Sequence, residues 1–174
     1  MSRITKAART GLIRACIYLC MIVSATVIQP AFAQATLDAQ IPPPIARPAA
    51  GVIENRTGRS PEAPFEIITS SGADYYLKLV DSRTGLDAIT VYVRGGQRIE
   101  VTVPLGSYRL RYAAGEIWRG ASHLFGPGEM TMYNESGSIF NFDISSGYVN
   151  GYTVELIRQV GGNMDTRRIN PSQF

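Results

Sequence analysis

The chain has 174 residues, the length of one domain of ordinary size, and its formal net charge is +3. Four of its 17 basic residues lie in the first 14 positions, so a chain cleaved after Ala33 carries 13 basic and 14 acidic residues and a net charge of −1. A globally basic nucleic-acid-binding protein is therefore disfavoured.

Residues 1–33 have the three regions of a secretory signal peptide. Residues 1–14 are basic without an acidic residue, residues 15–28 are mostly apolar, and Ala31 and Ala33 place small residues at positions −3 and −1 of a cleavage site. The apolar stretch is shorter than the roughly 20 residues of a membrane-spanning helix. We predict cleavage after Ala33 and a periplasmic or secreted product, where the periplasm assumes a Gram-negative host. The alternative is a leader retained as an anchor.

Both cysteines, Cys16 and Cys20, lie inside this leader. Bulky or charged neighbours at Arg14, Tyr18 and Leu19 break the pattern of a lipidated cysteine. After cleavage we expect no disulfide, no thiolate nucleophile and no cysteine metal ligand. The exported domain then depends on its hydrophobic core alone.

Residues 34–64 contain six prolines and no aromatic residue. The run Pro42-Pro43-Pro44 favours polyproline II and excludes a helix. We predict a flexible, Pro-rich linker that is disordered or extended. It is either a tether or docking segment or, the interpretation we favour, a plain spacer.

From Phe65 onward, apolar and polar residues alternate with period two, the pattern of half-buried strands. The clear runs cover 75–80, 89–94, 98–103, 107–112, 139–144 and 152–157, and weaker ones cover 65–69, 129–134 and 164–169. Gly95-Gly96-Gln97 and Pro104-Leu105-Gly106 have the composition of tight turns. We predict an all-β domain over 65–174, a single antiparallel β-sandwich of seven to nine strands or a small barrel.

Residues 99–112, IEVTVPLGSYRLRY, resemble the strand-turn-strand core of transthyretin-like modules, which include the PEGA and carboxypeptidase-regulatory groups. Gly106-Ser107-Tyr108-Arg109-Leu110 matches their Gly-x-Tyr-x-Leu strand. The resemblance implies a sandwich of the immunoglobulin or transthyretin-like kind that binds or supports rather than catalyses. It covers 14 of the 174 residues and implies no particular ligand.

Residues for catalysis and metal binding are scarce. His123 is the one histidine, so we expect no metal site and no cofactor. Ser122 is its direct neighbour, and adjacent residues on a strand point apart, which disfavours a Ser-His pair. Paired carboxylates for glycan hydrolysis remain open, because 14 acidic residues are present at unknown distances.

The segment 115–128 combines the one tryptophan, the one histidine, an arginine and a phenylalanine between glycines: Trp118, Arg119, His123 and Phe125. One interpretation is a recognition loop, because Trp and Arg dominate binding hot spots. The other, which we favour, is that Trp118 and Phe125 cap the core while Arg119 is solvated.

Arg109 and Arg111 share one face of their strand, opposite Tyr108, Leu110 and Tyr112. Guanidinium groups suit bidentate capture of a carboxylate or phosphate, so the pair could bind an anionic partner. The interpretation that we favour is a solvated sheet face that resists aggregation.

We therefore predict an exported, non-catalytic interaction module of the cell envelope. Its partner would be another envelope protein or an anionic polymer, not nucleic acid, and it would have no membrane span after cleavage. The first alternative is an inhibitor or immunity protein against an exported lytic or proteolytic enzyme, with 115–128 as the inhibitory loop. The second is a carboxylate-based glycan hydrolase.

Overall fold

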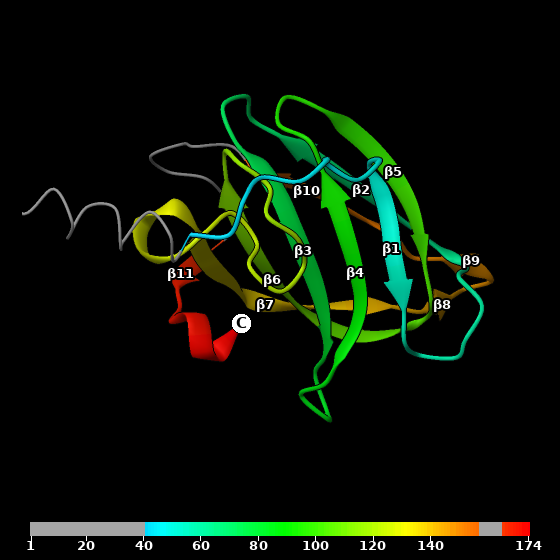
Figure 1. Ribbon diagram of the computed structural model, residues 1–174. Helices are drawn as coiled ribbons and strands as arrows, with labels where there is room; N and C mark the ends of the chain where they lie inside the picture. The colour runs from blue at the N-terminus through cyan, green and yellow to red at the C-terminus, as the bar shows by residue number, and fades with distance from the viewer. Residues whose placement is uncertain (1–40, 157–164) are drawn as a thin grey trace, which may run out of the picture.

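The computed structural model describes residues 41–156 and 165–174, and it confirms an all-β fold. Its strands are β1 (Gly51–Asn55), β2 (Ala63–Thr69), β3 (Asp74–Asp81), β4 (Asp87–Val93), β5 (Arg98–Val103), β6 (Gly106–Gly115), β7 (Met132–Phe142), β8 (Ile144–Ser145), β9 (Tyr148–Val149), β10 (Tyr152–Leu156) and β11 (Thr166–Arg168). Two short 3₁₀ turns are η1 (Gly128–Met130) and η2 (Pro171–Gln173). Figure 1 shows their arrangement.

The strands form a six-stranded sheet, a three-stranded sheet and a small hairpin. The six-stranded sheet has the order β1-β4-β3-β6-β7-β11, and all of its pairs are antiparallel. The three-stranded sheet has the order β10-β2-β5, and β8 pairs with β9 in the hairpin.

One pair contradicts the prediction of purely antiparallel strands. β10 runs parallel to β2, with Tyr152 opposite Phe65 and Leu156 opposite Thr69. The period-two pattern shows which residues face the core but carries no information on strand direction. The long chain between β2 and β10 supplies the crossover that a parallel pair needs.

The main core draws on both sheets. Apolar residues at alternate positions form one buried cluster, whose largest members are Phe65, Ile67, Tyr75, Leu77, Leu79, Ile89, Tyr108, Leu110, Phe140, Phe142 and Leu156. Apart from the exposed Ile144, the alternate residues of the six clear runs therefore lie inward, as the alternation predicts.

The described residues form eleven strand segments, more than the seven to nine strands predicted. Most of the two runs predicted at 129–134 and 139–144 belongs to one strand, β7, while Glu129 and Met130 lie in η1 and Ile144 begins β8. Its pairing with β6 is irregular between Arg109 and Arg111, where Ser136 Oγ accepts a hydrogen bond from Leu110 N at 3.3 Å. The short strands β8 and β9 were not predicted, since two residues are too few to show a period.

Part of the linker predicted over 34–64 forms strand in the structure. Residues 51–55 form β1, an edge strand paired with β4, and β2 begins at Ala63 rather than at Phe65. None of the five β1 residues is buried, and Val52 and Ile53 are adjacent. The strand therefore lacks the alternation of apolar and polar residues by which a core-facing strand is recognised. The predicted signal peptide, 1–33, and residues 34–40 lie outside the described residues. Within the described ranges, no helix has the length and apolar character needed to cross a bilayer.

Candidate functional site

The segment between β6 and β7 folds over the face of the large sheet that points away from the main core. Trp118 is 4% exposed and Phe125 is 1% exposed. The Trp118 ring stacks on Tyr76 at 5.6 Å and meets Tyr92 edge-on at 5.0 Å and Phe125 at 5.5 Å. These rings form a second, smaller hydrophobic cluster. Trp118 and Phe125 are thus packing residues in the structure.

Arg119 and His123, also predicted at this site, lie differently. The Nε of Arg119 donates to the main-chain oxygen of Phe125 at 3.3 Å, and its Nη1 donates to that of Pro42. His123 is exposed, and its main-chain N–H donates to Gly120 O at 3.1 Å in a tight turn. The structure therefore brings Trp118, Arg119 and Phe125 together and leaves the imidazole at the surface.

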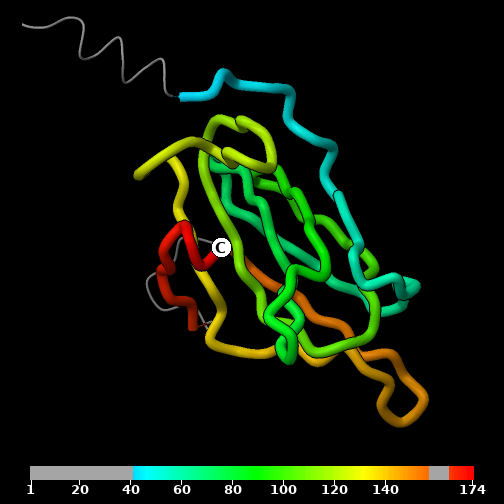
Figure 2. The backbone as a smooth tube through the Cα atoms, turned by 60° about the horizontal axis from the view of Figure 1, so that its bottom comes forward, coloured from blue at the N-terminus to red at the C-terminus, as the bar shows by residue number. Residues whose placement is uncertain are grey.

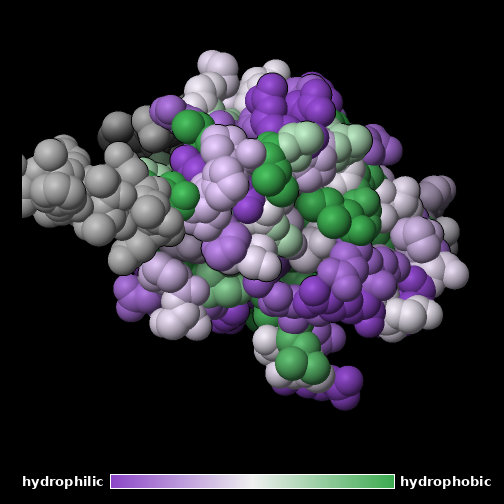
Figure 3. Space-filling model, viewed as in Figure 1, coloured by the Kyte–Doolittle hydropathy of each residue, from purple (hydrophilic) through white to green (hydrophobic). Residues whose placement is uncertain are grey.

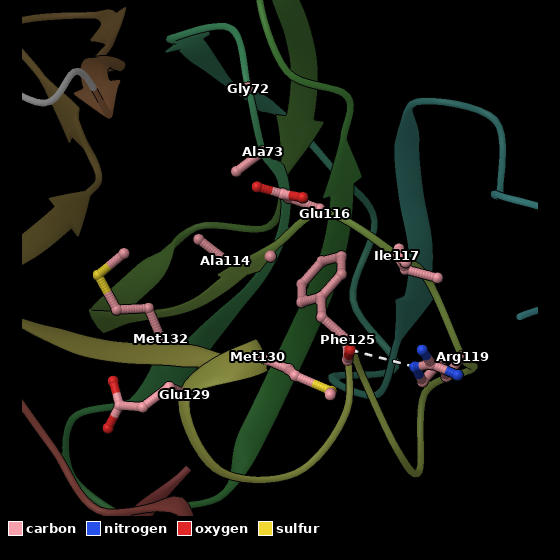
Figure 4. Close-up of a pocket in the computed structure, with 11 residues that line it drawn as sticks. Gly72, Ala73, Ala114, Glu116, Ile117, Arg119, Phe125, Glu129, Met130 and Met132 are labelled. Carbon is pink, nitrogen blue, oxygen red and sulfur yellow. Dashed lines mark hydrogen bonds between the residues drawn. The ribbon is translucent and has the colours of Figure 1, made fainter. Parts of the chain in front are cut away.

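A pocket of about 260 Å³ opens beside this segment. Figure 4 shows the Phe125 ring, Met130 and Met132 around it, with Glu116 and Glu129 at opposite sides and Arg119 at the far edge. Two acidic residues thus line one cavity. Glu129 is 90% exposed and holds Arg168 at 2.8 Å.

Arg109 and Arg111, the other predicted pair, converge on a carboxylate that the sequence reasoning missed. Glu135 on β7 lies directly opposite Arg111 on β6 and directly opposite Arg167 on β11. Its carboxylate receives Arg111 Nε at 2.7 Å and Arg167 Nη2 at 2.6 Å, with Arg109 Nη1 at 3.5 Å. The Glu135 side chain is 3% exposed. We call Arg109, Arg111, Arg167 and Glu135 the arginine cluster.

The arginine cluster belongs to a row of polar residues across the whole large sheet. Strand register places in this row, from β1 to β11, Glu54, Thr90, Lys78, Arg111, Glu135 and Arg167. Lys78 pairs with Asp87 at 2.7 Å, and its Nζ lies 4.5 Å from the centre of the Phe174 ring. One acid therefore balances Lys78, whereas one acid faces three arginines in the arginine cluster.

Two opposing effects act on the Glu135 carboxyl. Burial disfavours the charged form and raises its pKa, but hydrogen bonds from Arg167 and Arg111 and their positive charges outweigh burial. The pKa of Glu135 ends below its ordinary value, so the group is a carboxylate at neutral pH. Three guanidinium groups around one carboxylate leave two surplus positive charges. Exposed fractions of the side chains are 39% for Arg109, 22% for Arg111 and 66% for Arg167.

A second buried carboxylate, Asp74, lies at the start of β3. It accepts hydrogen bonds from Tyr92 Oη at 2.7 Å and Gly95 N at 3.0 Å, and Arg47 approaches it at 3.3 Å. Burial and the hydrogen bond to Asp74 raise the pKa of the Tyr92 phenol. Asp74 therefore joins the start of the large sheet to the chain that precedes β1.

Sequence signals for these missed residues are weak. Glu135 lies just after a weakly alternating run, and Arg167 lies on the three-residue strand β11, within another weak run. Only strand order and register reveal that Arg111 and Arg167 flank Glu135. Among the described residues, no three His, Cys, Asp or Glu side chains lie close enough to hold a metal ion.

Comparison of the chain with protein-family models, with curated proteins and with solved structures found no match.

Proposed function

We propose that this protein is an exported, non-catalytic β-sandwich module of the cell envelope that binds an anionic component through the arginine cluster. The predicted signal peptide supports export. Two sheets that share one core support a sandwich of the immunoglobulin or transthyretin-like kind.

The observation that carries the proposal is the surplus of positive charge around Glu135. The carboxylate fixes three guanidinium groups in one place, so little side-chain entropy is lost when they meet an anion. Within the described chain, the buried Nε of Arg109 has no hydrogen-bond partner. The face drawn in Figure 3 supports polar recognition, because its hydrophobic residues form small separate groups among hydrophilic ones.

Binding to poly-L-glutamate tests this function, with poly-L-lysine as the opposite-charge control. The Arg109→Gln/Arg167→Gln variant should bind at least about tenfold more weakly, because two charge-assisted contacts are lost. The matched control is Arg83→Gln/Arg98→Gln, which removes the same charge from residues outside the arginine cluster and should bind like the wild type. An equal loss of affinity in both double variants would mean that net charge, and not the arginine cluster, attracts the polymer.

One observation favours the second candidate function, an inhibitor of an exported enzyme. The β8–β9 hairpin projects from the body, as Figure 2 shows in orange. Its apolar residues are exposed: Ile144 by 55%, Tyr148 by 77% and Val149 by 40%. An exposed, projecting hairpin suits insertion into a cleft better than the packed segment 115–128 does. Ile144→Ser/Tyr148→Ala should then abolish inhibition at unchanged thermal stability.

We rank the glycan-hydrolase hypothesis behind binding. Glu116 and Glu129 line one pocket, which is the arrangement that the hypothesis needs. A general-acid carboxyl, however, works from a shielded environment that raises its pKa. Glu129 is instead 90% exposed and paired with Arg168.

A further inference from the structure

The β8–β9 hairpin is an uncharged projection from the body of the protein (Figure 2). Ile144 lies opposite Val149 in its two-residue strands. Ser146 and Gly147, with φ values of 53° and 80°, form the two-residue turn that suits the twist of a hairpin. Residues 144–151 contain no charged side chain.

The β3–β4 loop, residues 82–86, leaves the same end of the molecule. β3 ends at Asp81, which lies opposite Tyr108 near the start of β6. The start of β6 also lies opposite Phe142, which ends β7 just before the hairpin. Figure 1 shows the loop as a green projection beyond β3 and β4. We call the β8–β9 hairpin and residues 82–86 together the hairpin end.

Both projections carry large apolar side chains outside the core. Leu86 is 69% exposed, and the three apolar residues of the β8–β9 hairpin, Ile144, Tyr148 and Val149, are exposed as well. None of these four residues belongs to either hydrophobic cluster of the described chain. Exposed apolar residues that gather at one end of a protein indicate a surface at which it binds another body.

The acidic residues next to the two projections are held in their bases. Asp81 Oδ1 accepts hydrogen bonds from Arg83 N at 3.0 Å and from Thr84 N at 2.9 Å. Asp143 Oδ1 accepts a hydrogen bond from Asn150 Nδ2, and Asn150 N donates to Asp143 O at 2.8 Å. Beyond these carboxylates, the residues of both projections are neutral except for Arg83.

Two separate convex projections fit the surface of a bilayer better than a protein partner. A protein would have to offer one hollow for each projection, whereas the interfacial region of a bilayer adapts to either. Tyr148 suits that region, because its ring is apolar and its hydroxyl is polar. Arg83, close to Leu86, can place its apolar stem in the same layer and its guanidinium among the headgroups. The paired main chain of the hairpin avoids bringing free N–H and C=O groups into a layer poor in water.

We propose that the hairpin end binds the surface of a lipid bilayer, with Leu86, Ile144 and Tyr148 entering its interfacial region. Burial of apolar surface drives this binding, so it needs no anionic lipid. Contact at two points also fixes the orientation of the domain on the membrane. The inference goes beyond the proposed function, because it uses no residue of the arginine cluster.

Co-sedimentation of the exported protein with vesicles of pure phosphatidylcholine tests the proposal, in enough sodium chloride to screen ionic contacts. Leu86→Ser/Ile144→Ser should bind at least about tenfold more weakly than the wild type, because two apolar side chains no longer leave water. Val52→Ser/Ile117→Ser is the matched control, since it removes two exposed apolar side chains that lie outside the hairpin end. This control should bind like the wild type.

A second measurement locates the contact at the hairpin. Brominated phosphatidylcholine should quench the added emission of Tyr148→Trp. The wild type should keep its emission, because its one tryptophan, Trp118, is buried and follows the opposite end of β6. A retained leader would bind vesicles in every variant but would not bring position 148 to the bromine atoms.

Equal vesicle binding by the wild type and Leu86→Ser/Ile144→Ser, or no quenching of Tyr148→Trp, would overturn the proposal. No binding of the wild type to vesicles would overturn it too, and the hairpin would then be a surface for a protein partner. Arg109→Gln/Arg167→Gln should bind these neutral vesicles like the wild type. A loss of vesicle binding in that variant would mean that the attraction is ionic and that the hairpin end is not its source.

Discussion

Glu135 shows how a single residue organises the outer face of the large sheet. It is nearly inaccessible to solvent, yet it lies among three arginines whose side chains stay partly exposed. Replacing it with glutamine keeps the shape and removes the charge. The guanidinium groups then turn to water, which limits the cost to about 1–3 kcal/mol of unfolding free energy, measurable by urea denaturation at pH 7.

The pH dependence of that difference follows from the lowered pKa of Glu135. A carboxyl with a lower pKa in the folded state stabilises the protein above its unfolded-state pKa of about 4.3. This stabilisation is lost as the pH falls through the folded-state pKa. Wild type and Glu135→Gln should therefore differ in stability at pH 7 and converge in strong acid. A difference that grows toward low pH would contradict the ion-pair account.

Trp118 belongs to a residue type that is common in binding sites, but here its side chain is buried and packs inside the protein. Its ring contacts Tyr76, Tyr92 and Phe125 in the second hydrophobic cluster. Trp118→Ala should cost about 3–5 kcal/mol, as expected for loss of a buried aromatic residue. His123→Ala, a few residues away and exposed, should change stability by less than about 0.5 kcal/mol. Small and comparable losses of unfolding free energy in both variants would instead support the interpretation of Trp118 as a surface recognition residue.

At the scale of elements, Gly115 decides how the chain leaves β6 and returns over the sheet. A Cβ at this position would collide with Phe125 Cβ and lie 2.5 Å from Met130 O. Gly115→Ala should destabilise the protein by about 1–3 kcal/mol and shift the fluorescence of Trp118, because Phe125 has to move. Gly128→Ala is the control for the packing effect: its φ of 60° also strains an alanine, but nothing lies within 4 Å of the added Cβ. Its fluorescence spectrum should match the wild type.

The sequence pattern predicted some strands better than others, because the strands differ in how their faces are buried. Burial largely alternates along β5 and β6, because one face packs in the core and the other is polar. β3 and β4 are buried on both faces, since Tyr76 and Tyr92 pack in the second hydrophobic cluster, but their residues in the main core still recur with period two. β1 could not be predicted from the sequence pattern, because it is an exposed edge strand with no buried residue. The direction of β10 could not be predicted either, because side chains alternate with the same period in parallel and antiparallel strands.

At the scale of the whole molecule, the candidate site depends on register that no local pattern contains. Alternation does place Arg109 and Arg111 on one face of a strand. It does not show that Glu135 and Arg167, from the next two strands of the sheet, meet them there. Likewise, the proline run predicts an extended arm but not its contacts with Arg119 and Asp74.

Export is the property on which the cellular part of the proposal depends. The predicted cleavage after Ala33 would give an exported protein that begins at Gln34. Intact-mass measurement of the protein purified from the cell envelope or medium checks this directly. A mass that retains residues 1–33 would favour the membrane-anchored alternative.

The salt dependence of poly-L-glutamate binding tests most directly whether the arginine cluster is the anion site. Affinity measured across a range of sodium chloride concentrations reports the number of ionic contacts as the slope of log affinity against log salt. We predict a negative slope for the wild type, a clearly shallower one for Arg109→Gln/Arg167→Gln and an unchanged one for Arg83→Gln/Arg98→Gln. Equal slopes in the wild type and the Arg109→Gln/Arg167→Gln variant, or no measurable binding at low salt, would contradict the account.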